Sequence, residues 1–193
     1  MTILSNPVPG AAAPDAPDDT ALMARVTAGD EAAFRALADL HLGRMLRLAQ
    51  KMLGSPADAD EVAQEALLRI WLKAGSWDPR RSRLSTWIYT ITYRICLDRL
   101  RGRRTEPLDE AMEIPDPTPA ADELLARKAD LGRLRSALAS LPARQRAALI
   151  LFYHEELSGQ EAADVLDLRL RAFWSLLHRA RQAAERFLKP SAS

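Results

Sequence analysis

Apolar residues recur every three or four positions over most of the chain, and this spacing places them on one face of an α-helix. Between residues 42 and 53 the spacing gives a single apolar face, which Gly54 ends. Ser55 followed by Pro56 is a start signal for another helix, because proline is well tolerated at the first helical position. The pattern therefore predicts two helices separated by a tight break.

The second of these helices carries a core stripe between residues 62 and 70 and is broken at Gly75 and Asp78. A third helix is expected from about residue 82 to residue 101. At 100° per residue it has a core face, a second apolar stripe and a polar stripe between them. The second apolar stripe consists of Tyr89, Tyr93, Cys96 and Leu100, and the polar stripe of Arg83, Thr86, Thr90, Arg94 and Arg101.

Arginines beside aromatic side chains are typical of surfaces that hold single-stranded nucleic acid. A solvated arginine face over an aromatic core would give the same pattern, so both interpretations of this third helix stay open at this point.

Proline and acidic residues interrupt the helical pattern between residues 105 and 123, where no lysine or arginine occurs. We interpret this segment as a flexible acidic linker. Residues 1–20 are rich in proline, alanine and aspartate and are predicted to be a disordered tail. The predicted fold class is all-α, with two small helical domains at 21–104 and 124–189.

The C-terminal domain ends in a helix-turn-helix pattern. Ser158 and Glu161 have the spacing of a capping box, in which each side chain accepts a hydrogen bond from the other residue's backbone N–H. A short apolar helix follows, then a tight turn, then a helix that carries Arg171 and Arg179. Such a geometry places the second helix in a DNA major groove.

The composition excludes several classes of protein. The 27 basic and 26 acidic residues give a net charge of +1, so any DNA-binding charge is local. The single cysteine, Cys96, excludes an intramolecular disulfide and fits a reducing cytoplasm. The N-terminus lacks the features of a signal peptide, and no apolar run approaches the roughly 18 residues of a membrane span. We expect a cytoplasmic protein with no direct membrane insertion.

No enzyme motif is evident. The chain has no glycine-rich phosphate loop and no His-Glu-x-x-His motif. Its histidines, His41, His154 and His178, are scattered and cannot build a zinc site with one cysteine at any usual spacing. The segment from His154 to Glu156 is interpreted as a polar helix end. We predict no catalytic residue, no metal site and no cofactor.

Four segments, in this order and spacing, resemble the extracytoplasmic-function sigma factors of bacterial RNA polymerase. They are GDEAAFRALADLHLGRMLRLAQKMLG, DADEVAQEALLRIWLKAGSWDP, RSRLSTWIYTITYRICLDRLRGRR and LPARQRAALILFYHEELSGQEAADVLDLRLRAFWSLLHRAR. The resemblance implies two helical domains that bind core RNA polymerase and promoter DNA, with a flipped base held by the loop from Gly75 to Arg83. Trp77 or Ser82 could line that pocket.

The resemblance also implies which residues act. The expected DNA-binding residues are Arg80, Arg81, Ser82, Arg83, Trp87, Thr90, Arg94 and Arg101 for the melted minus-ten strand, and Arg169, Arg171, Trp174, Ser175, His178 and Arg179 for the double-stranded minus-thirty-five element. The expected polymerase-binding residues are Asp58, Asp60, Glu61, Gln64, Glu65, Leu68 and Leu72, which include an exposed stripe of carboxylates, an amide and leucines. The same stripe could instead be buried within its own domain.

Departures from the family concentrate in the DNA-reading helices. Basic residues commonly stand where this chain has Trp174 and Leu176, and Arg and Asn commonly stand where it has Thr90 and Arg94. We therefore expect an unusual promoter preference. Trp174 either contacts a thymine methyl group in the groove or is an exposed hydrophobe that an inhibitor covers.

Two further expectations concern control and alternatives. Family members are commonly held by an anti-sigma protein, and no further domain follows Leu188, so we expect such a partner and a stress or envelope signal. The main alternative is a stand-alone helix-turn-helix regulator. It fits the C-terminal third equally well but leaves the stripe at 58–71 and the acidic linker unexplained, and it should dimerise on a palindrome.

Overall fold

The computed structural model describes residues 19–105 and 132–188, and every regular element within these two ranges is helical. The N-terminal half contains α1 (Asp19–Thr27), α2 (Glu31–Leu53), α3 (Pro56–Lys73), the 3₁₀ turn η1 (Ala74–Ser76) and α4 (Leu84–Thr105). The C-terminal half contains a helix at residues 132–140, α6 (Ala143–Tyr153), α7 (Gly159–Val165) and α8 (Leu170–Leu188). The all-α prediction is confirmed.

Most of the predicted tail and linker lies outside the described residues, which exclude 1–18, 106–131 and 189–193. At the edges of those segments, α1 already begins at Asp19 and α4 continues to Thr105. The predicted end of the third helix near residue 101 was therefore too early. Arginine is a good helix former, and Arg103 also gains an acidic partner on α3, so the basic run extends the helix.

Local signals define the helix ends as predicted. The Asp30 side chain caps the start of α2 by accepting two backbone N–H groups, and Gly54 ends the helix with a left-handed φ of 79°. The Ser55 hydroxyl then caps α3 by accepting the N–H of Asp58 at 3.3 Å, with Pro56 in the first turn. The predicted break between the two helices is confirmed.

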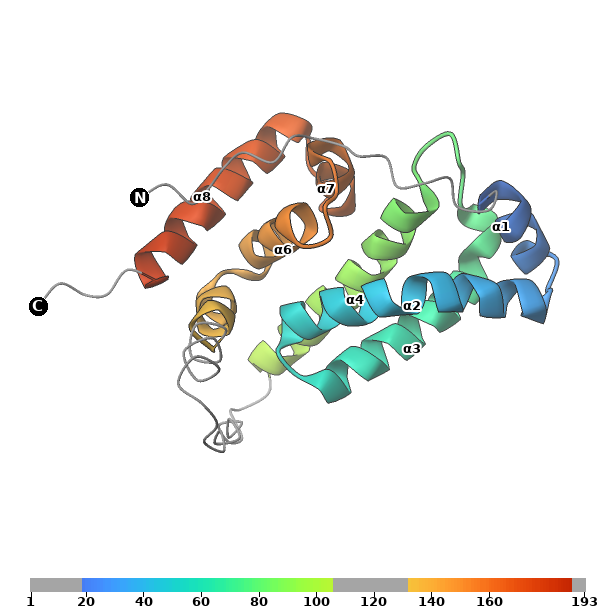
Figure 1. The fold of residues 1–193 in the computed structure, drawn as a ribbon, viewed down its shortest axis with the longest axis horizontal. Coiled ribbons are helices and arrows are strands. Elements are labelled where there is room, and N and C mark those ends of the chain that lie inside the picture. Colours follow the sequence, from blue (N-terminus) through green and yellow to red (C-terminus); the bar gives the residue numbers. More distant parts are fainter. Residues whose placement is uncertain (1–18, 106–131, 189–193) are drawn as a thin grey trace, which may run out of the picture.

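In the N-terminal half, α2, α3 and α4 pack side by side, and α1 closes one end against η1 (Figure 1). The predicted inward stripe of α3 is buried in this core: Val62, Ala63, Ala66 and Ile70. In the C-terminal half, α6, α7 and α8 surround the fully buried Phe173. Leu176 is buried beside it, so this departure from the family is a core residue of the helix-turn-helix and not an exposed one.

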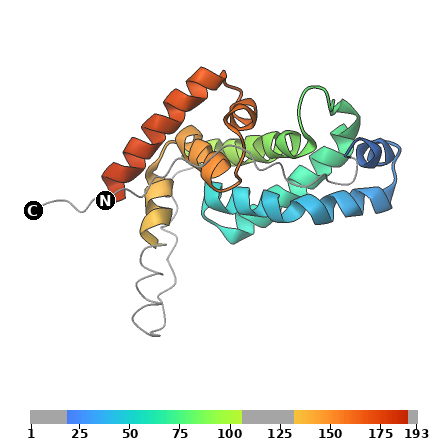
Figure 2. The same ribbon diagram turned by 45° about the horizontal axis from the view of Figure 1, so that its top comes forward.

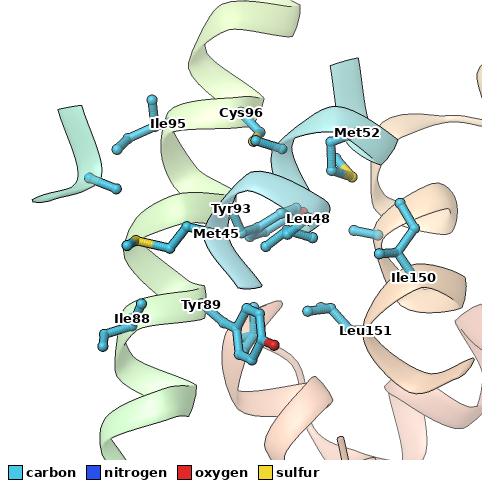
Figure 3. Packing of buried hydrophobic residues seen from close by; sticks show 14 of the residues in the cluster. Met45, Leu48, Met52, Ile88, Tyr89, Tyr93, Ile95, Cys96, Ile150 and Leu151 are labelled. Carbon is cyan, nitrogen blue, oxygen red and sulfur yellow. The ribbon is translucent and has the colours of Figure 1, made fainter. Parts of the chain in front are cut away.

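The two halves pack against each other, with α6 alongside α2 and α7 alongside the first turns of α4 (Figures 1 and 2). One continuous apolar cluster runs through both halves (Figure 3). The second apolar stripe of α4 explains this arrangement, because Tyr89 and Tyr93 turn toward Ile150 and Leu151 of α6. Across 19–105 and 132–188, no helix is both long enough and apolar enough to cross a membrane.

Candidate nucleic-acid interface and docking surface

The loop before α4 is closed by its own hydrogen bonds. The indole N–H of Trp77 donates to the backbone carbonyl of Ser82 at 3.2 Å, and Asp78 accepts from the backbone and guanidinium of Arg80. These hydrogen bonds from Arg80 hold the pKa of Asp78 below its usual range. The loop is therefore a shaped turn that presents Arg80 and Arg81 to solvent.

The polar stripe of α4 lies partly under the C-terminal half. Thr86 is only 2% exposed, whereas Trp87 and Thr90 are half-buried and Arg94 is exposed. The Thr90 hydroxyl donates to the backbone carbonyl of Thr86 at 2.9 Å, but the Thr86 hydroxyl itself meets no hydrogen-bond partner in the described chain.

A cleft of about 690 Å³ lies between the two halves. From the predicted DNA-binding residues it collects Arg81, Ser82, Thr86, Trp87, Thr90 and Arg94 of the N-terminal half with Arg169 of the C-terminal half; of these, only Thr86 was absent from the expected DNA-binding set. Asp78, Asp164 and Asp167 also line it, and pattern analysis missed the last two because only tertiary packing brings them there. Trp77 is not among the lining residues, so Ser82 is the better candidate for a base pocket.

The recognition helix α8 separates its polar and apolar sides cleanly. Phe173 and Leu177 are buried, while Arg171, Ser175, His178 and Arg179 are all exposed. Within this exposed face, the Ser175 hydroxyl donates to the Arg171 carbonyl at 3.1 Å, and Arg179 donates to the Ser175 carbonyl at 3.3 Å. The predicted upstream readers therefore share one face, apart from the cleft that holds Arg169.

Trp174 packs on its own half of the molecule while remaining 44% exposed. Its ring meets Phe152 edge-on, with centroids 5.3 Å apart. It also covers Gly159 at the start of α7, where an added Cβ would come within 2.5 Å of the indole. Glycine at that position is thus what lets the tryptophan tie α8 to α7, and a DNA contact through its exposed edge stays a prediction.

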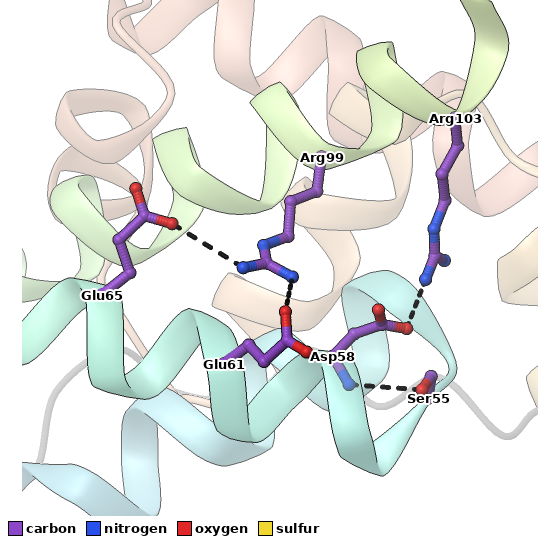
Figure 4. Close-up of polar contacts among 6 residues, drawn as sticks. All are labelled: Ser55, Asp58, Glu61, Glu65, Arg99 and Arg103. Carbon is purple, nitrogen blue, oxygen red and sulfur yellow. Dashed lines mark hydrogen bonds and ion pairs between the residues drawn. The ribbon is translucent and has the colours of Figure 1, made fainter. Parts of the chain in front are cut away.

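The carboxylates of α3 are tied to arginines of α4 (Figure 4). Asp58 pairs with Arg103, and Glu61 pairs with Arg99 at 2.6 Å. Glu65 lies 3.8 Å from Arg99 and pairs with Arg69, one turn along α3, at 2.6 Å. Part of the predicted docking stripe therefore serves to hold α3 on α4.

Electrostatics confirm that these pairs are formed in the folded state. Partial burial would raise the pKa of Asp58, but hydrogen bonds from Arg103 and Ser55 outweigh it and keep the pKa below its usual range. The hydrogen bond to Glu61 raises the pKa of Arg99. These carboxylates therefore stay ionised, and each partner orients the other.

The remaining residues of the predicted docking stripe face solvent. Asp60 and Gln64 are exposed, and the leucines are more so than core residues ever are, with Leu68 57% and Leu72 71% exposed. Beside them lies an apolar groove of about 360 Å³. Its lining residues are Glu31, Phe34, Leu67, Leu68 and Trp71, and the rings of Phe34 and Trp71 meet edge-on at 4.9 Å. The contribution of α2 was missed because it requires knowing which helix lies beside α3.

Comparisons with known proteins agree with this arrangement. The chain matches the family model described as Sigma-70 region 2 over residues 37–106 and the one described as Sigma-70, region 4 over residues 131–183. It is 31% identical over 173 residues to the ECF RNA polymerase sigma factor SigM of Mycobacterium tuberculosis (strain ATCC 25618 / H37Rv), covering 88% of this chain and 84% of that relative. This chain belongs to the ECF sigma factor family. It is thus an alternative sigma factor, a subunit that directs bacterial RNA polymerase to particular promoters.

Other relatives extend the match over both halves of this sigma factor. It is 28% identical over 181 residues to SigW of Bacillus subtilis (strain 168), covering 86% of this chain and 94% of that relative. Its fold is similar to that of CnrH, solved in complex with the cytosolic domain of CnrY, with a TM-score of 0.67 at 23% identity over 90% of this chain and 99% of that one. The sigma factor RpoE of Bartonella quintana, solved with the anti-sigma factor NepR, gives a TM-score of 0.63 at 23% identity over 82% and 98%.

The predicted family is therefore confirmed, and it consists of transcription regulators. The region 2 match falls on the half that contains α2, α3 and α4, and the region 4 match on the half that contains α6, α7 and α8. A stand-alone helix-turn-helix regulator would account only for the second match.

The capping box of the sigma factor's helix-turn-helix generates a pH prediction. Glu161 accepts the backbone N–H of Ser158 at 2.9 Å and pairs with Arg83 at 3.4 Å. Burial would raise the Glu161 pKa, but Ser158 and Arg83 outweigh it and lower the pKa below 4.5. A lowered folded-state pKa means that this stabilisation is present above pH 4.5 and is lost as the pH falls through the folded-state value.

We expect Glu161→Gln to keep the capping box but to remove its titration. The melting temperature of the wild type should therefore fall more steeply below pH 4.5 than that of the variant. At neutral pH the variant should lose up to about 1 kcal/mol. Thermal unfolding followed by circular dichroism checks this, with Glu185→Gln, an exposed glutamate of α8, as the control. Parallel pH profiles for wild type and Glu161→Gln would contradict the assignment.

Proposed function

We propose that this sigma factor docks on core RNA polymerase through α3 and the adjoining groove of α2. The observation that carries the proposal is the exposure of Leu68 and Leu72 beside the apolar groove. Apolar burial would supply affinity, while Asp60, Gln64 and the ion-paired carboxylates would set the register of a partner helix. The pairs of Asp58, Glu61 and Glu65 with α4 keep those carboxylates in place before the partner arrives.

The loop before α4 and its polar stripe are proposed to hold the melted minus-ten strand. Melting costs about 1.4 kcal/mol per stacked step. A base that is stacked or held in a pocket returns about 1–3 kcal/mol, so a few captured bases keep a small bubble open without ATP. The residues proposed for this work are Arg80, Arg81, Ser82, Arg83, Trp87, Thr90, Arg94 and Arg101, with Ser82 in the base pocket.

The exposed face of α8 is proposed to read the minus-thirty-five element in the major groove. Its side chains mix cations with hydroxyl and imidazole groups, as groove readers do. Arg169 at the start of the helix, Trp174 with its exposed edge, and the residues Arg171, Ser175, His178 and Arg179 complete the set.

Control by an anti-sigma protein is proposed from the relatives. CnrH was solved with the cytosolic domain of CnrY, and RpoE with the anti-sigma factor NepR. We propose that this chain has such a partner, answers a stress or envelope signal, acts in the cytoplasm beside the polymerase, and works without a catalytic site or cofactor of its own.

Leu68→Asp should abolish stable binding to core RNA polymerase. A charged side chain in the centre of an apolar contact removes a binding hot spot, which is worth at least about 2 kcal/mol, or about thirtyfold in affinity. Co-elution with core polymerase on a sizing column at moderate salt measures this. Leu40→Asp changes an equally typical exposed leucine on α2 and should co-elute like the wild type. If Leu68→Asp still formed a one-to-one complex, the docking surface would lie elsewhere.

Arg171→Ala should weaken binding of the holoenzyme to a selected upstream element by about 1–3 kcal/mol if Arg171 reads a base edge. Loss of a phosphate contact alone would instead lower affinity for all sequences alike and reduce the salt slope by about one. Titrations at several salt concentrations separate the two. Arg186→Ala, an equal charge change near the end of α8, should have a smaller effect. Unchanged affinity and promoter choice for Arg171→Ala would refute its role as a reader.

A further inference from the structure

A buried carboxylate joins the two halves of the molecule. Glu155, in the loop after α6, has a side chain that is only 2% exposed and that lies against α2 and α4. The Tyr89 hydroxyl of α4 donates to one Glu155 carboxylate oxygen at 2.5 Å, and the Arg47 guanidinium of α2 lies 3.6 Å from the same oxygen. Both partners come from the N-terminal half, so Glu155 is buried by contact between the halves.

The apolar contact around this carboxylate is extensive. Ile150 and Leu151 of α6 meet Leu48, Met52 and Tyr93 of the N-terminal half in the cluster of Figure 3. The Arg146 guanidinium of α6 also donates to the backbone carbonyl of Met52, at the end of α2. A cation there is favourable because helix C-termini carry partial negative charge.

The closed arrangement is nevertheless built to open. The second carboxylate oxygen of Glu155 is buried and has no hydrogen-bond partner in the described chain. A buried carboxylate that is only partly satisfied costs free energy, which water would return once the halves separate. An apolar side chain at this position would have closed the interface more tightly.

Closure covers the surface that the proposed function needs. The turn between α7 and α8 lies over Thr86 and the half-buried Thr90 of α4, and its Asp164 and Asp167 line the same cleft as Arg81 and Arg94. Arg83 pairs with Glu161 of α7. Carboxylates of one half thus neutralise arginines of the other where DNA phosphates would otherwise approach.

The distances exclude promoter binding in this arrangement. The minus-ten and minus-thirty-five elements lie about 25 base pairs apart, or about 85 Å at 3.4 Å per base pair. In the closed molecule, residues proposed to read both elements line one cleft. The chain between residues 106 and 131 can span about 90 Å when fully extended, so it permits the required separation only if the halves come apart.

We propose that the free sigma factor is held in a self-inhibited closed state by the contact of Glu155 with Tyr89 and Arg47, and that opening of this contact exposes the promoter-reading face of α4. The proposal rests on the proposed DNA-binding role of α4. Only the open fraction binds DNA, so the apparent affinity of the free chain is lowered in proportion to that fraction.

Glu155→Lys tests the proposal, because it places an ammonium group against Arg47 in the closed state but in water in the open state. The matched control is Glu156→Lys, the same charge change on the exposed neighbour. We expect Glu155→Lys to raise the radius of gyration in small-angle X-ray scattering and to bind a short mixed-sequence single-stranded DNA at least about tenfold more tightly than Glu156→Lys does. Circular dichroism should show equal helix content in both.

A charge-swapped rescue separates the contact from general effects. Adding Arg47→Glu to Glu155→Lys should restore the compact state and the weak binding. Adding Arg35→Glu, an exposed arginine of α2, gives the same net charge and should leave the molecule open. A compact Glu155→Lys variant, or an open one that binds DNA no better than Glu156→Lys, would overturn the proposal. Failure of the wild type to co-elute with core polymerase would instead count against the proposed function, since scattering decides closure independently.

Discussion

The contact of α6 and α7 with α2 and α4 determines which surfaces of this sigma factor are open to partners. Its centre is Glu155, a carboxylate held by a tyrosine hydroxyl and a distant arginine inside an otherwise apolar interface. Apolar burial favours closure and the partly satisfied charge opposes it. A balance of this kind suits a protein whose two DNA-reading halves must part on a promoter.

Helix α4 carries three duties at once, and its residues are divided among them. One side fills the core of the N-terminal half, Arg99 and Arg103 hold α3 through its carboxylates, and the tyrosine stripe receives the C-terminal half. The polar stripe between these contacts is what remains for nucleic acid. Because α4 also orients α3, the docking leucines of α3 and the promoter-reading loop form one rigid unit, whereas α8 is carried by the other half.

Much of this could be predicted from the sequence because the signals are local. Gly54, Ser55 and the Ser158–Glu161 capping box define helix ends through their own backbones, and the stripe from Val62 to Ile70 follows from helical periodicity. The family match then gave the order of the two halves.

The rest depends on packing between distant segments. The stripe of Tyr89 and Tyr93 was evident, but nothing local showed that α6 would cover it. The segment at 154–156 was interpreted as a polar helix end, yet Glu155 turns inward, since its burial requires the other half to be present. Trp174 likewise has meaning only beside Gly159, which is remote from it in the sequence but adjacent in space.

The most direct test of this account is the distance between the halves, measured by electron paramagnetic resonance on nitroxide labels at Asp39→Cys in α2 and Gln182→Cys in α8. Cys96 is buried, and its burial raises the thiol pKa to about 12, so it should not take up label in the folded protein. The account predicts one narrow, short distance in the free protein, replaced by a much longer distance when core polymerase is added. A broad, long distribution in the free protein, unchanged by polymerase, would contradict it.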